Sequence, residues 1–166
     1  MRPGGAPPVD VDLVDGILRG YAEKGVFKGY ARLEHSASVA RYRIRWFYSQ
    51  PMDVTLDRKR QTIALPEFLP RVDVDPAMVR HLRAFLKLMS DLPEHRRLDE
   101  TRAQLTLRRK GDALTLSVRS LDGDLDYATR KLVHIANEIL LVFLSSRSYD
   151  PYKIEVFGVD PEQLWG

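Results

Sequence analysis

The sequence contains no cysteine. This absence excludes disulfide bonds, metal sites with thiolate ligands and catalysis by a thiol nucleophile. It is in keeping with a reducing compartment, and the first residues, Met1–Pro8, lack the apolar core of a signal peptide. The sequence therefore predicts a protein that works in the cytoplasm.

Long apolar runs are also missing. The longest apolar stretch lies around Ile135–Leu144 and is interrupted by Asn137 and Glu138. A helix that crosses a bilayer needs about 20 apolar residues in a row. We therefore expect no membrane among the partners of this protein.

The motifs of common catalytic sites do not occur either. The sequence has no Gly-rich phosphate loop, no GxSxG motif and no HExxH motif. His134 and Glu138 are four residues apart, which would place them on one helix face as half of a metal or acid–base pair. A polar pair at a helix surface is the favoured interpretation, and an enzyme built on these two residues is the minor alternative.

Three alternating aspartates, Asp122, Asp124 and Asp126, are similar to the beginning of a calcium-binding loop. Such a loop needs Gly at its sixth position and Glu at its twelfth, where this chain has Tyr127 and Val133. Capping of the following helix explains these aspartates better. We therefore predict no catalytic, cofactor-binding or metal-binding residues, and a protein that is not an enzyme.

The length and composition that remain are those of one globular domain. The chain has 166 residues, of which 44% are hydrophobic and 30% charged, and its net charge is +3. Residues 1–9 are rich in Gly and Pro, which predicts a disordered tail. We expect a single domain over residues 10–158 and a C-terminal tail over residues 159–166.

The periodicity of apolar residues predicts helices and strands in a definite order. Residues 10–24 form a first helix with an apolar stripe of Leu13, Ile17 and Tyr21, flanked by Val14 and Leu18. Alternating patterns then predict three or four strands, a helix, a two-stranded hairpin, a third helix and a short final helix. Short hairpins imply antiparallel pairing. The predicted fold class is therefore α+β, with an antiparallel sheet of five or six strands and helices packed mainly on one face.

This order of elements resembles that of type III secretion chaperones and related small bacterial α+β proteins. The resemblance rests on the hairpins at Arg41–Leu65 and Ala103–Arg119 and on the closing helix. It implies a dimeric chaperone-like protein that binds an unfolded segment of a partner.

Arginines form the main local anomaly of charge. Arg41, Arg43 and Arg45 alternate along one strand and must share a face of the sheet, and Arg108 and Arg119 lie on the outward faces of their own strands. Such a face, with Phe47 and Tyr48 nearby, can hold phosphates and stack bases. A solvated face paired with local carboxylates is the favoured alternative.

The end of the third helix is apolar on nearly every side. A helix of this kind must be buried on every side, under other elements or against a second copy of the chain. We expect a homodimer whose interface includes Ile139, Leu140, Phe143 and Leu144. The functional prediction is a non-catalytic binding or adaptor module that recognises a protein segment. The alternative is a nucleic-acid-binding protein that uses the arginine face.

Overall fold

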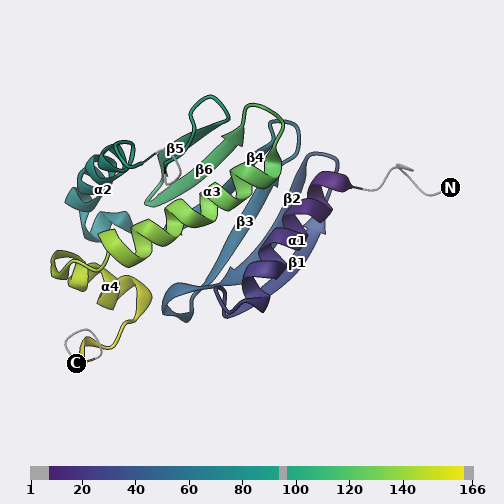
Figure 1. Ribbon diagram of the computed structural model, residues 1–166. Coiled ribbons are helices and arrows are strands. Elements are labelled where there is room, and N and C mark those ends of the chain that lie inside the picture. The colour runs from purple at the N-terminus through teal and green to yellow at the C-terminus, as the bar shows by residue number, and fades with distance from the viewer. Residues whose placement is uncertain (1–7, 94–96, 163–166) are drawn as a thin grey trace.

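The computed structural model describes residues 8–93 and 97–162, which form four α-helices and one six-stranded antiparallel sheet (Figure 1). The sheet has the strand order β1-β2-β3-β4-β6-β5, so β1 and β5 are its edges. This arrangement confirms the predicted α+β class. The helices are α1 (Val9–Glu23), α2 (Pro76–Met89), α3 (Leu125–Glu138) and α4 (Asp150–Phe157). The strands are β1 (Gly29–His35), β2 (Val39–Arg45), β3 (Pro51–Asp57), β4 (Thr62–Leu69), β5 (Ala103–Lys110) and β6 (Ala113–Ser120).

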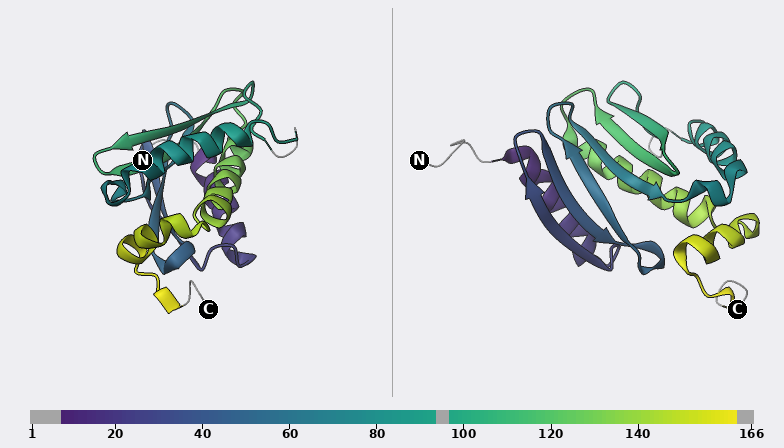
Figure 2. Two further views of the ribbon diagram at one scale, coloured as in Figure 1. Left: turned by 90° about the vertical axis from the view of Figure 1, so that its left-hand side faces the viewer. Right: turned by 180° about the vertical axis from the view of Figure 1, so that it is seen from behind.

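Two helices cover one face of the sheet. Helices α1 and α3 lie across the strands in Figure 1, and α2 and α4 lie at one end of the sheet. Seen from behind in Figure 2, the strands are nearest to the viewer, with no described helix in front of them. The sheet therefore has an inner face under α1 and α3 and an open face on the other side.

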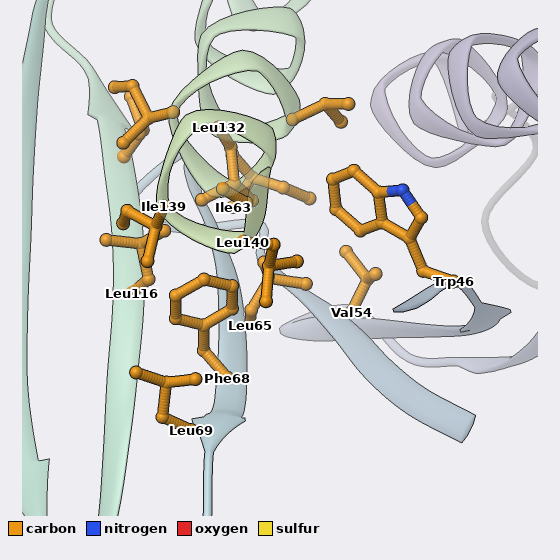
Figure 3. Close-up of a cluster of buried hydrophobic side chains, with 14 of the residues drawn as sticks. Trp46, Val54, Ile63, Leu65, Phe68, Leu69, Leu116, Leu132, Ile139 and Leu140 are labelled. Carbon is orange, nitrogen blue, oxygen red and sulfur yellow. The ribbon is translucent and has the colours of Figure 1, made fainter. Parts of the chain in front are cut away.

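Side chains along each strand point alternately to the two faces of the sheet, and the apolar ones predicted to face the core do lie on the inner face. Tyr42, Ile44 and Trp46 of β2 are all buried, as expected from their spacing. Figure 3 shows Ile63, Leu65 and Leu116 gathered with other apolar side chains beneath α3 and the segment that follows it. The other buried residues of these strands include Val54, Leu56, Leu114 and Val118.

The first helix is rotated relative to its predicted apolar stripe. Val11 and Val14 are buried, whereas Leu13 is 37% exposed. The Tyr42 hydroxyl donates a hydrogen bond to the Val11 carbonyl at 2.9 Å, and Asp10 forms an ion pair with Arg58 at 3.0 Å. Burial alone would raise the pKa of Asp10, but the hydrogen bonds from Arg58 and from the Val11 amide, together with the positive charge of Arg58, outweigh it, so the pKa lies below its usual range. These polar contacts between helix and sheet orient α1, and the periodicity of apolar residues could not predict them.

The third helix begins as predicted and ends earlier. The Asp124 carboxylate accepts a hydrogen bond from the Tyr127 amide at 3.0 Å, so it caps α3. Regular α-helix stops at Glu138 and continues as a π-helical turn, η3 (Ile139–Phe143), whereas the sequence predicted one helix to about Ser146.

The four predicted interface residues lie in the core of their own chain. Ile139 and Leu144 are 0% exposed, Leu140 is 3% exposed and Phe143 is 8% exposed. The placement of these side chains at a dimer interface was therefore wrong. The physical reason is cover from the same chain, because the Phe143 ring lies 5.5 Å from that of Phe85 on α2.

The C-terminal part of the chain closes one end of the core. Helix α4 ends at Phe157, and Gly158 adopts the left-handed conformation (φ +66°) that ends helices. Phe157 is buried, as the sequence predicted. Val159 still packs against the core, whereas residues 163–166 of the expected C-terminal tail and residues 1–7 of the expected N-terminal tail lie outside the described residues. Across the described ranges, no helix has both the length and the apolar character needed to span a bilayer.

Candidate binding face

The open face of the sheet is built from the outward positions of its strands. One continuous row crosses five strands through register partners that are mostly small: Arg41, Thr55, Ala64, Ser117 and Thr106. Small side chains in the middle of a sheet leave its surface flat and its backbone close to solvent. This row forms an accessible floor, with longer charged side chains on either side of it.

On the β2 side of this floor, two of the predicted arginines are held by carboxylates. Arg41 donates to Glu34 and, at 2.9 Å, to Asp53, while Arg43 donates to Asp53 through Nε at 2.8 Å. The hydrogen bond from Arg43, helped by that from Arg41, holds the pKa of Asp53 below its usual range. Asp53 is therefore ionised at neutral pH, and both of its oxygens are occupied.

The side chains of the remaining predicted arginines have no partner among the described residues. The guanidinium groups of Arg45 on β2, Arg108 on β5 and Arg119 on β6 make no hydrogen bond or ion pair with the described part of the chain. Arg119 lies opposite Thr62 of β4, and Arg108 lies opposite Thr115 of β6. The structure thus places all five arginines on one face but divides them into two groups, with β3 and β4 between β2 and β6.

The aromatic residues predicted to stack bases are engaged elsewhere. Tyr48 stacks on Phe157 of α4 with ring centroids 4.9 Å apart, and Phe47 lies 5.1 Å from Trp46. The outward positions of β2, β3, β4, β5 and β6 in the described structure carry no aromatic side chain. The face therefore lacks the stacking platform that single-stranded nucleic acids use.

A hollow of about 730 Å³ lies at one end of the open face, and sequence reasoning missed it. It forms where β4 departs from its register with β6 between Leu65 and Leu69. Pro66 has no amide hydrogen to donate at this bulge, and its carbonyl accepts a hydrogen bond from the Thr115 hydroxyl at 2.7 Å. The lining residues are Arg41, Arg43, Gln50, Pro51, Met52, Asp53, Thr55, Pro66, Glu67, Phe68, Pro70, Val156 and Phe157.

The proline within β4 is the signal that could have indicated this bulge, because Pro in a strand favours irregular pairing. The bulge lets Phe68 and Leu69 both point into the core, where each is 0% exposed. Glu67, between Pro66 and Phe68, is left exposed at the hollow. The volume of the hollow lies in the usual range of ligand sites in proteins.

A second concavity, of about 620 Å³, lies between α2, α3 and the edge strand β5. Leu86, Met89, Leu98, Leu105 and Ile135 supply most of its apolar lining. None of the predicted site residues lines it.

The two weaker chemical candidates are surface features. His134 is exposed on α3, and partial desolvation, together with Lys131 and Arg130, lowers its pKa. It is therefore neutral at pH 7.

The aspartate series forms caps and ion pairs. The Asp122 carboxylate accepts a hydrogen bond from the Asp124 amide at 2.9 Å, and Arg102 forms ion pairs with both aspartates. The residues described here contain no cluster of three or more potential metal ligands.

Comparison of the chain with protein-family models, with curated proteins and with solved structures finds no match. The resemblance to type III secretion chaperones therefore stays a prediction.

Proposed function

We propose that this chain is a non-catalytic, cytoplasmic binding module that recognises a protein segment on the open face of its sheet. The observation that carries the proposal is the one-sided cover of the sheet, with helices on the inner face and a hollow on the other. Core packing occupies one side of the five strands from β2 to β6, and no described helix covers their opposite side, which is therefore accessible to a partner. An extended segment of a partner could lie along the flat row of small side chains and insert one of its own side chains into the hollow.

Nucleic acid is the second candidate, favoured by the guanidinium groups of Arg45, Arg108 and Arg119, which have no partner within the described ranges. Two observations weigh against it. Arg41 already uses both of its Nη groups for Glu34 and Asp53, so at Arg41 a phosphate would have to compete with these two carboxylates. The outward strand positions also offer no ring on which a base can stack.

Fluorescence anisotropy separates the two candidates. We expect labelled RNA and duplex DNA of about 20 nucleotides not to bind at about 50 mM salt, where contacts to phosphates are strongest. A nucleic-acid site would bind both probes and lose affinity steeply at about 200 mM salt. Replacing Arg41, Arg43 and Arg45 together by Gln would then flatten the salt dependence by up to about three counterions. Binding with that signature would overturn the protein-segment proposal.

The expected homodimer is not needed for this proposal. The residues that suggested it are buried, and the exposed part of the same segment consists of Leu141 (54%) and Val142 (52%). Stable interfaces bury about 800 Å² on each partner, far more than two side chains supply. The proposed module therefore acts through the open face of a single chain.

A further inference from the structure

We infer that the hollow binds an apolar side chain that lies next to a carboxylate, so that the recognised segment presents an acidic residue beside an aromatic or aliphatic one. This inference rests on the proposed function and names the chemistry of its partner. It follows from the two unlike walls of the hollow, one apolar and one that carries Arg41 and Arg43 with their partner Asp53.

The apolar wall is preformed. Phe68 and Phe157 line the hollow but are buried, so the apolar surface that a ligand can reach comes from half-buried residues such as Met52, Pro66 and Val156. Phe157 is fixed by stacking on Tyr48 and by an edge contact with Tyr152 at 5.6 Å. Tyr48 itself adopts a left-handed backbone conformation (φ 59°), which is unusual for a residue other than Gly and brings its ring onto Phe157. A bound apolar group would therefore meet a rigid surface and lose little free energy to rearrangement.

The wall that carries the arginines has hydrogen-bond donors without an acceptor in the described chain. Arg43 is anchored to Asp53 through Nε, and within the described chain its Nη1 and Nη2 groups have no acceptor. Arg41, in contrast, uses one Nη group for Glu34 and the other for Asp53. Arg45 lies two positions further along the same strand, opposite Pro51 of the lining, although it does not line the hollow itself. Arg43, which Asp53 holds in place, and the neighbouring Arg45 thus give this edge donors that have no acceptor among the described residues.

Charge complementarity selects a carboxylate for this edge. Asp53 has both oxygens occupied by Arg41 and Arg43, so it offers little to a cationic ligand. A carboxylate, by contrast, can accept two parallel hydrogen bonds from the free face of an arginine. Glu67 also lines the hollow, but it lies on β4, two strands away from Arg43. Solvent and salt therefore screen its repulsion of an anion bound at Arg43.

The test uses two probes that differ only in charge. N-acetylphenylalanine carries an aromatic ring and a carboxylate, and N-acetylphenylalaninamide carries the same ring with a neutral amide. Titration of each probe into the ¹⁵N-labelled protein should shift the amide signals of Gln50, Thr55 and Glu67. We expect the carboxylate probe to bind about three to ten times more tightly than the amide.

Matched variants identify the cation responsible. Arg43→Gln should bring the affinity ratio of the two probes close to one, whereas Arg108→Gln, on the same face but outside the hollow, should leave it unchanged. The spectra themselves report whether each variant is folded. Equal binding of the two probes, a ratio that survives in Arg43→Gln, or shifts confined to other surfaces would each overturn the inference. Nucleic-acid binding in the anisotropy experiment would overturn the proposed function alone, so the two failures are distinguishable.

Discussion

Replacement of Leu116 by Ala is expected to lower the free energy of unfolding by about 2–5 kcal/mol. Leu116 is 0% exposed on β6, between Leu65 of β4 and Leu107 of β5, and lies under Ile139 in Figure 3. Truncation removes apolar contacts and leaves a cavity that a six-stranded sheet and a helix cannot close. Urea unfolding monitored by circular dichroism measures the change.

The matched control is Ser117→Ala, at the next position of the same strand. Ser117 points to the open face, so its substitution should change the free energy of unfolding by less than about 0.5 kcal/mol. A small effect at Leu116 together with a large effect at Ser117 would show that the two faces of the sheet are assigned the wrong way round.

Replacement of Asp150 by Ala is expected to cost about 3–5 kcal/mol, because it leaves a buried ammonium group without its counter-ion. The Lys153 Nζ atom lies 2.9 Å from Asp150, and the side chains of Lys153 and Asp150 are only 3% and 9% exposed. Both residues belong to α4, which supplies Val156 and Phe157 to the hollow. Loss of this pair should therefore loosen one wall of the hollow as well as destabilise the fold.

Two further variants test the cause of that loss. The double variant Asp150→Ala with Lys153→Met removes both charges, and we expect it to be more stable than Asp150→Ala alone. Glu155→Ala, on the same helix α4, breaks the exposed ion pair between Glu155 and Arg71. It should lower the free energy of unfolding by less than about 1 kcal/mol. Equal losses in Asp150→Ala and in the double variant would show that the buried charge is not the cause.

The sequence predicted the features of the fold that depend on local alternation. The inward set of Tyr42, Ile44 and Trp46 and the outward set of Arg41, Arg43 and Arg45 follow from the two-residue period of a strand. The start of α3 at Asp124 and the end of α4 at Gly158 were also predictable, because a helix cap depends only on residues that are close in sequence.

Features that depend on contacts between distant segments were not predictable in this way. The burial of Ile139, Leu140, Phe143 and Leu144 depends on neighbours such as α2, whose position no periodicity reveals. An apolar segment has the same sequence whether its own chain or a second copy covers it.

The candidate site shows the same division. Placement of the five arginines on the open face was predictable, but their ion pairs depend on register. Asp53 lies opposite Arg43 because β2 and β3 pair in that register, whereas Arg45 lies opposite Pro51 and pairs with no acid of the described chain. The hollow depends on a bulge in β4 and on the approach of α4, which begins more than 80 residues after that strand starts.

Photo-crosslinking from the centre of the open face would show directly whether a protein segment binds there. We would introduce p-benzoylphenylalanine at Ser117, irradiate cells that produce the protein, and sequence the attached product by mass spectrometry. The control position is Ala84, which is exposed on α2 away from the open face. We expect a crosslink from Ser117, and not from Ala84, to a protein segment with an acidic residue beside an apolar one. A nuclease-sensitive product, a crosslink to a second copy of the chain, equal labelling from both positions or no product at all would contradict it.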